Sequence, residues 1–330
     1  MRVRALWYRK GALHLIDQRE LPARTVIRSL RHVRDVAQAI RTMVVRGAPA
    51  IGVTAAYGMA LAHRERTYTP ARAARLLRET RPTAHDLVVG IEAVRSAWVA
   101  GDDPLAAADR YREKVVEECH RIGMAGAPLL ARAHQVLTHC NAGALATVEW
   151  GTALAPIRVA RERGADLFVW VDETRPLLQG ARLTAWELAR ERIPHAVIVD
   201  NAAGAFMRSG DVDAVIVGAD RIARNGDFAN KIGTYEKAVV ARENRIPFYV
   251  AAPWSTFDAR RADGRAIPVE ERGEEEVLGL ASRRIAPLKS HARNPAFDVT
   301  PARYVTAFVT PGGVVRPGAL AATLHRQRTE

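Results

Sequence analysis

The spacing of hydrophobic and polar positions changes along this chain. Near the N-terminus, apolar residues alternate with polar ones on both sides of a Lys-Gly pair at residues 10–11. The apolar positions of this stretch are Val3, Ala5, Trp7, Leu13 and Leu15. A period of two interrupted by such a pair predicts a β hairpin or a short meander.

From residue 33 the apolar residues recur at helical spacing. They form one stripe between Val33 and Val44, and Gly47 stands where a C-terminal helix cap is expected. Residues 48–62 are small and apolar on every side, which predicts a buried helix that other backbones approach closely. Further helical segments cover residues 70–123, with breaks at residues 81–83 and 101–104. Cys119 lies on the apolar face of the last segment, so we expect a core thiol.

After residue 126 short apolar runs alternate with helical stretches. We expect strands over residues 135–139, 166–171, 195–199, 214–217, 248–251 and 304–309, and helices over 152–163, 181–190 and 234–244. Continuous apolar strands joined by helices are typical of a parallel sheet covered on both faces. The pattern therefore predicts an α/β protein. Residues 1–125 form a mainly helical N-terminal domain that opens with the hairpin, and residues 126–330 form a Rossmann-like catalytic domain.

Polar or reactive residues follow four of the predicted strands. These are Cys140-Asn141, Asp172-Glu173, Asp200-Asn201 and Asp220-Arg221. Ligands of open α/β sheets bind outside the carboxyl ends of the strands, so we expect the binding site there. The first strand-helix turn lacks a Gly-x-Gly-x-x-Gly sequence, which disfavours a dinucleotide cofactor.

Asp220 is the strongest catalytic candidate, and Cys140 is the second. Burial at the end of an apolar strand raises a carboxylate pKa and suits Asp220 to act as a general acid, although a helix cap or an ion pair with Arg221 is the alternative. Cys140 precedes a turn of small residues whose amides would stabilise a thiolate. A structural thiol is the alternative for Cys140.

Other residues are candidates for binding an anionic, oxygen-rich small molecule. Arg46 precedes the backbone amides of Gly47-Ala48, Arg81 precedes a Pro-Thr turn, and Asn230-Lys231 is expected to open a helix whose dipole attracts anions. Gln179, before the predicted helix, would bond a hydroxyl group. The alternatives are ordinary solvated arginines and simple helix caps.

Composition narrows the classes of function. The formal net charge of +13 comes from arginines scattered along helices, and no nucleic-acid-binding motif accompanies it. Two cysteines give neither a disulfide framework nor a zinc site, and the ten histidines contain no i, i+4 pair, so we expect no metal. The N-terminus does not resemble a secretory signal, and no run is long enough to span a bilayer. We expect a soluble cytoplasmic protein without nucleic-acid or membrane partners.

Several longer motifs have a familiar pattern. They are VRGAPAIGVTAAYG from Val45, CNAGALAT from Cys140, DETRPLLQGARLTAWEL from Asp172, VDAVIVGADRIARNGDFANKIGTY from Val212 and PFYVAAP from Pro247. Together they resemble the 5-methylthioribose-1-phosphate isomerase family, from the opening hairpin to residues 310–313. The wider superfamily includes ribose-1,5-bisphosphate isomerases and the regulatory subunits of translation initiation factor 2B.

The resemblance implies an aldose-ketose isomerase of methionine salvage that converts 5-methylthioribose 1-phosphate into 5-methylthioribulose 1-phosphate. It implies a homodimer without a metal or organic cofactor, and Cys140 and Asp220 as the catalytic pair. The substrate contacts that it implies are Arg46, Gly47, Ala48, Arg81, Gln179, Asn230 and Lys231.

The sequence departs from the family pattern at two places near the expected pocket. Asp86 stands where Asn is usual, and Glu149-Trp150 replace small residues and Tyr. These departures leave the preferred C5 substituent open. The alternatives are an isomerase of 5-deoxyribose 1-phosphate or ribose 1,5-bisphosphate, and a non-catalytic regulatory protein. A regulatory protein need not retain both Cys140 and Asp220, which disfavours that alternative.

Overall fold

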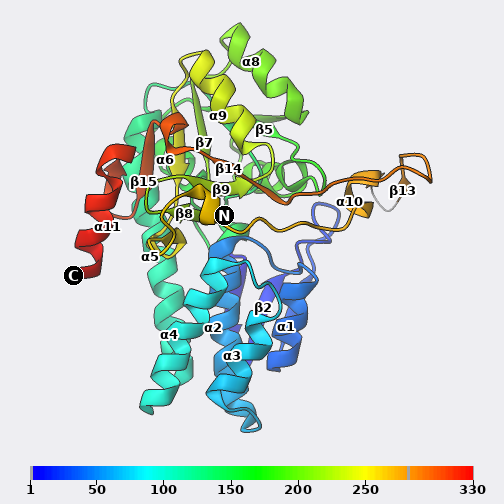
Figure 1. The fold of residues 1–330 in the computed structure, drawn as a ribbon, viewed down its shortest axis with the longest axis vertical. Coiled ribbons are helices and arrows are strands. Elements are labelled where there is room, and N and C mark those ends of the chain that lie inside the picture. The colour runs from blue at the N-terminus through cyan, green and yellow to red at the C-terminus, as the bar shows by residue number, and fades with distance from the viewer. Residues whose placement is uncertain (1–2, 281–282, 330) are drawn as a thin grey trace.

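A seven-stranded sheet forms the centre of the C-terminal part of the chain in the computed structural model, which describes residues 3–280 and 283–329 (Figure 1). The strand order is β16-β15-β10-β7-β4-β5-β6, with β16 antiparallel to β15 and the other neighbours parallel. In that order the strands are Gly313–Val315, Ala307–Thr310, Phe248–Ala251, Ala214–Val217, Gln135–Thr138, Phe168–Asp172 and His195–Ile198. The predicted α/β fold with a parallel sheet is confirmed.

The strand order places a topological switch point beside β4. From β4 the chain adds β5 and β6 on one side and then returns to place β7 on the other. The loops that leave β4 and β7 therefore separate at the carboxyl edge of the sheet. Such a crevice is where open α/β sheets bind their ligands.

Alternate residues of the strands face two different layers of helices, as a period of two requires. On one face Val136 and Ile216 pack with residues of α5 (Pro104–Leu130) and α6 (Leu154–Glu162). On the other face Val215 and Val250 pack with α8 (Ala203–Ser209), α9 (Thr234–Glu243) and α11 (Leu320–Thr329). Helix α7 (Ala185–Arg190) follows a π-helical turn over Gly180–Thr184.

The expected strands are all present, and their ends differ from the expected ones by up to three residues. The largest difference is at β15, where Ala302–Tyr304 form a 3-10 turn before the strand begins at Ala307. An apolar run does not distinguish such a turn from the first residues of a buried strand.

The N-terminal part contains an antiparallel sheet and a group of helices, coloured blue to cyan in Figure 1. Strands β1 (Leu6–Arg9) and β2 (Ala12–Ile16) form the predicted hairpin, and β3 (Ile27–Leu30) pairs with β2. The helices are α1 (Val33–Arg41), α2 (Ala48–Glu65), α3 (Pro70–Arg78), α4 (His85–Ala100) and α5. Helix α5 runs through the expected domain boundary at residues 125–126, and the division into two domains stays a prediction.

Helix α2 is the buried helix that the sequence predicts, because every residue from Pro49 to Ala62 is buried. Its backbone lies against α4, where a Cβ atom on Gly90 would lie 2.1 Å from the backbone oxygen of Gly52. Only glycine permits this approach. The prediction that Gly47 caps α1 is wrong: α1 ends at Arg41, and Gly47, with φ of +94°, immediately precedes α2.

A second, four-stranded sheet carries the end of the long central motif. Its order is β11 (Phe257–Asp258), β8 (Arg221–Ala223), β9 (Phe228–Lys231) and β14 (Phe297–Thr300). The prediction that Asn230-Lys231 open a helix is therefore wrong. Both residues end strand β9, because they pair with Asp298 and Phe297 of β14, and α9 begins only at Thr234.

An extended arm leaves this sheet between β11 and β14. It contains α10 (Glu275–Leu278) and the strands β12 (Gly279–Leu280) and β13 (Arg283–Arg284), and it projects from the body of the protein (Figure 1). None of the helices in the described part of the chain is long and apolar enough to cross a membrane.

Candidate active site

One pocket at the switch point is lined by all nine residues that the sequence assigned to a site. It lies between the carboxyl ends of β4 and β7, the start of α2 and the base of the arm. The nine residues are Arg46, Gly47, Ala48, Arg81, Cys140, Gln179, Asp220, Asn230 and Lys231. The structure therefore brings together segments that are up to 185 residues apart in the chain.

Cys140 leaves β4 in a left-handed backbone conformation, with φ of +64°. Its amide donates a hydrogen bond to Thr174 Oγ1 at 2.9 Å, and its carbonyl accepts one from Thr184 Oγ1 at 2.6 Å. Burial raises the pKa of the Cys140 thiol, while the charges of Lys231 and Arg46 oppose the rise. The partly buried thiol thus faces two cations whose charges favour its thiolate.

The turn after Cys140 differs from the expected thiolate-binding loop. The amides of Ala144 and Leu145 donate to the buried carboxylate of Glu187, at 2.7 and 3.1 Å. Of the turn, the amide of Asn141 is the one that bonds the thiol and lowers its pKa. Glu187 also accepts from Asn141 Nδ2 and from the buried Arg158, so it fixes the turn rather than the substrate.

Asp220 follows β7 by way of Gly218 and is half-buried at the pocket wall. Its backbone amide donates to the carbonyl of Ala229, which ties the residue to the second sheet. Burial raises the pKa of the Asp220 carboxyl, and Lys231, Arg81 and Arg46 act against the rise. A raised carboxyl pKa suits proton donation near neutral pH.

Three cations from separate segments surround the two candidates. Arg46 donates from Nε to Gln18 Oε1 and from Nη1 to the carbonyl of Asn141. Arg81 bonds Glu270 at 2.6 Å, and Lys231 Nζ donates to the carbonyl of Ala296 at 2.6 Å. Each guanidinium or ammonium group is thus held in place before a ligand arrives.

The remaining predicted residues supply amides and an uncharged acceptor. Gly47 and Ala48 place the N-terminus of the 18-residue helix α2 at the pocket, an arrangement that favours anions. Asn230 Nδ2 donates to Thr234 Oγ1, so this amide is committed to the protein. Within the described chain, Gln179 Oε1 is buried without a hydrogen-bond partner, which leaves it available to a ligand hydroxyl.

The structure adds pocket residues that the sequence reasoning missed. Arg272, Glu276 and Asn294 reach the pocket from the arm, and His139 lines it beside Cys140. Arg272 bonds Glu276 and Glu270, which places a second arginine near Arg81. The three arm residues lie in a charged part of the sequence that resembles a solvated surface, so no local signal distinguishes them.

Neither departure from the family pattern lines the pocket. Asp86 is fully buried, and its Oδ2 accepts from Thr256 Oγ1 at 3.4 Å. Glu149 pairs with Arg4 at 2.7 Å, and Trp150 stacks on His120. The expectation that these residues influence the choice of sugar directly therefore lacks a structural basis.

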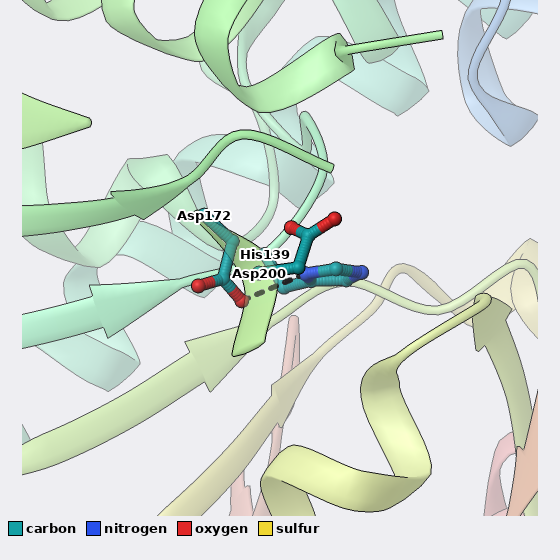
Figure 2. Close-up of side chains that lie close together, drawn as sticks. All are labelled: His139, Asp172 and Asp200. Carbon is teal, nitrogen blue, oxygen red and sulfur yellow. Dashed lines mark hydrogen bonds and ion pairs between the residues drawn. The ribbon is translucent and has the colours of Figure 1, made fainter. Parts of the chain in front are cut away.

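His139, Asp172 and Asp200 form a cluster in which one ligand atom from each residue lies within 4.8 Å of the others (Figure 2). Most of these groups have partners: both ring nitrogens of His139 are hydrogen-bonded, and Asp200 accepts the amides of Thr174 and Arg175. Asp172 Oδ2 bonds His139, whereas Asp172 Oδ1 has no hydrogen-bond partner among the described residues. The buried ammonium of Lys237 lies 3.6 Å from Asp172 and supplies a positive charge. These contacts favour a protein-internal ion pair over a metal site.

Comparison with known proteins identifies the family of the chain and several similar proteins. Residues 44–317 match the model of the Initiation factor 2 subunit family. The curated methylthioribose-1-phosphate isomerase of Roseiflexus sp. (strain RS-1) is 52% identical, over 95% of each chain. That of Aquifex aeolicus (strain VF5) is 47% identical, over 98% of this chain and 71% of its own.

Two solved structures share the fold over nearly the whole chain. The 5-methylthioribose 1-phosphate isomerase from Pyrococcus horikoshii OT3 is 42% identical with a TM-score of 0.90, covering 99% of this chain and 96% of its own. A structure described as the translation initiation factor eIF-2B, subunit delta, from A. fulgidus is 45% identical with a TM-score of 0.85, covering 96% and 97%.

Proposed function

Because the chain belongs to the methylthioribose-1-phosphate isomerases of the Initiation factor 2 subunit family, we propose that the pocket at its switch point carries out that reaction with Cys140 and Asp220 as the catalytic pair. The chain is an aldose-ketose isomerase that converts 5-methylthioribose 1-phosphate into 5-methylthioribulose 1-phosphate in methionine salvage. The observation that supports the site is that all nine predicted residues line one pocket.

The chemistry requires an acid before it requires a base. An aldose esterified at C1 does not open its ring as a free sugar does, so the bond from C1 to the ring oxygen breaks only as that oxygen is protonated. Asp220 donates this proton, in keeping with its raised pKa.

Cys140 then moves the proton between carbons. As a thiolate it takes the proton from C2, which gives an enol phosphate, and it returns a proton to C1. The C2 hydroxyl gives its proton back to Asp220 as the carbonyl forms. Protons and electron pairs balance, and both side chains end in their starting states.

The phosphate of the substrate binds the cationic side of the pocket. Arg46 and Lys231 line the pocket together with the start of α2, where the amides of Gly47 and Ala48 would bind an anion. Gln179 Oε1, which has no partner among the described residues, accepts from a sugar hydroxyl. Closing the pocket around the sugar excludes water and strengthens each of these contacts.

The test is turnover of three substrates by the purified protein: methylthioribose 1-phosphate, 5-deoxyribose 1-phosphate and ribose 1,5-bisphosphate. We expect the first to have the highest kcat/KM. Cys140→Ser and Asp220→Asn should each lower kcat by about 10²–10⁴-fold, the usual contribution of a positioned acid or base. Asp166→Asn, at a side chain that is 93% exposed, is the matched control and should leave kcat unchanged. Near wild-type turnover by both pocket variants would refute the catalytic pair.

Three further expectations belong to the proposal. A homodimer is checked by light scattering of the purified protein. The division into two domains is checked by thermal unfolding of the whole chain, which should show two transitions if the domains unfold independently. A cytoplasmic location is checked by fractionation of the source cells.

A further inference from the structure

A buried imidazole connects the two halves of the pocket. His139, the residue before Cys140, is 1% exposed. Its Nδ1 lies 2.8 Å from Asp172 Oδ2, the contact drawn in Figure 2, and its Nε2 lies 2.8 Å from the backbone oxygen of Ile232. The first contact reaches the end of β5, and the second reaches the turn that follows β9.

The hydrogen-bond partners fix the orientation of the ring. The carbonyl of Ile232 only accepts hydrogen bonds, so Nε2 carries a hydrogen. Nδ1 and Asp172 then share a proton, either as imidazolium and carboxylate or as imidazole and carboxylic acid. A carboxylate beside one ring nitrogen is the common device for fixing which hydrogen bond the other nitrogen makes. In each state the ring donates from Nε2 to the turn.

The turn that receives this hydrogen bond positions Asn230 and Lys231. Thr234 Oγ1 donates to the carbonyl of Lys231 at 2.6 Å and accepts from Asn230 Nδ2 at 2.9 Å. Gly233 has φ of +99°, and a Cβ atom there would lie 3.2 Å from His139 Nε2. The ring therefore packs directly against the backbone of the turn and sets its distance from β4.

The other half of the pocket depends on the same carboxylate residue. The amide of Cys140 donates to Thr174 Oγ1, which donates to the carbonyl of Asp172 at 3.0 Å. Asp172 thus supports Cys140 through its backbone and His139 through its side chain. The left-handed conformation of Cys140 is held on both sides, at the amide by Thr174 and at the carbonyl by Thr184.

We propose that His139 is a positioning residue of the isomerase: held by Asp172, it fixes the distance between Cys140 and the end of β9 that carries Lys231. The inference rests on the proposed function, because it assigns a role within that reaction. His139 makes no covalent contribution, and its effect acts through Cys140 and Lys231.

A displaced turn has a chemical consequence that can be measured without substrate. Lys231 makes the largest contribution that opposes the raised pKa of the Cys140 thiol. If Lys231 moves away, less positive charge faces the sulfur and the thiol ionises at higher pH. The charged groups that face Cys140 are Lys231, Arg46 and Asp220. Those that face His139 are Asp172, Asp200, Lys237 and Asp298.

The experiment compares His139→Gln and His139→Ala with the wild type. Glutamine places one donor end in the site, so it serves Ile232 or Asp172 but not both, whereas alanine serves neither. His134→Gln is the matched control, because His134 is exposed and lies just before the same strand. Each protein is assayed for kcat and KM, for the pH dependence of Cys140 alkylation by iodoacetamide, and for thermal unfolding. Cys119 is fully buried and does not compete for the reagent.

We expect kcat to fall at least tenfold in His139→Gln and further in His139→Ala, with a smaller change in KM. We also expect the midpoint of Cys140 alkylation to shift to higher pH in the same order. His134→Gln should match the wild type. Wild-type kcat and an unshifted alkylation midpoint in His139→Gln would overturn the proposal, as would a loss of thermal stability alone. If the wild type does not turn over any of the three sugar phosphates, the proposed function is refuted instead. The pH midpoints of Cys140 alkylation in the wild type and the His139 variants still decide whether His139 positions Lys231.

Discussion

Replacing Asp86 with asparagine should change how the stability of the protein depends on pH. Asp86 is fully buried in α4, and its Oδ1 has no hydrogen-bond partner in the described part of the chain. Burial raises the pKa of Asp86 to about 7, and the charge of Asp220 adds to the rise. The folded protein therefore keeps a proton that the unfolded chain loses near its usual pKa of 3.8.

The sign follows from proton binding in the two states. Between pH 3.8 and about 7 the folded state binds more protons at this site than the unfolded state, so stability falls as pH rises through this window. The difference between the two pKa values corresponds to about 4 kcal/mol, at about 1.4 kcal/mol for each pH unit. Asparagine stays neutral at every pH and does not incur this loss. A buried amide nitrogen without an acceptor costs about 1–3 kcal/mol, but this cost does not vary with pH.

The assay is urea unfolding of wild type and Asp86→Asn at several pH values from 5 to 8. The free energy of unfolding of the variant should rise relative to that of the wild type by about 2–3 kcal/mol over this range, the part of the linkage that falls inside it. Asp102→Asn, at an exposed position after the same helix, is the control and should show no such trend. A difference between variant and wild type that is independent of pH would refute the reasoning, because Asp86 would then ionise alike in both states.

Two other substitutions test the frame of the pocket. Gly47→Ala forces a side chain into a backbone with φ of +94° and places its Cβ 2.5 Å from the Cα atom of Ala146. We therefore expect the free energy of unfolding to fall by at least about 2 kcal/mol and KM to rise. Urea unfolding and steady-state kinetics measure these two effects. Glu187→Gln weakens the buried ion pair with Arg158 and the hydrogen bonds that fix the turn after Cys140. We expect the free energy of unfolding to fall by about 3 kcal/mol and kcat to decrease. Unchanged values of both, by the same two assays, would contradict the role of Glu187.

The sequence predicted the sheet because buried strands and amphipathic helices carry their own periodic signals. The six expected parallel strands and the buried helix α2 follow from burial alone. The sequence does not indicate that β9 ends at Lys231, since two hairpin strands of three and four residues are too short to show a period. The sequence does not show which helix Gly47 borders, because a glycine between two helices fits either the end of one or the start of the next.

The candidate site was predictable only where a residue directly follows a strand or belongs to a long motif. Cys140 and Asp220 meet because β4 and β7 are neighbours, and that neighbour relation depends on the strand order, which the apolar pattern does not encode. Arg272 and Asn294 reach the pocket through the return of the arm. Their position depends on long-range folding, so their charges alone resemble those of an ordinary surface.

The two catalytic candidates need opposite charge states, and one lysine influences both. Burial raises the pKa of Asp220 and of Cys140, and Lys231 is the largest opposing contribution at each group. A substrate phosphate that neutralises Lys231 would raise both pKa values further. That change favours the protonated Asp220 needed to open the ring, and it disfavours the thiolate of Cys140. Because Arg46 belongs to the same phosphate site, the backbone amide of Asn141, which bonds the thiol, then has to sustain the thiolate. The chemistry therefore requires a fixed distance between Cys140 and Lys231, and the buried link through His139 supplies it.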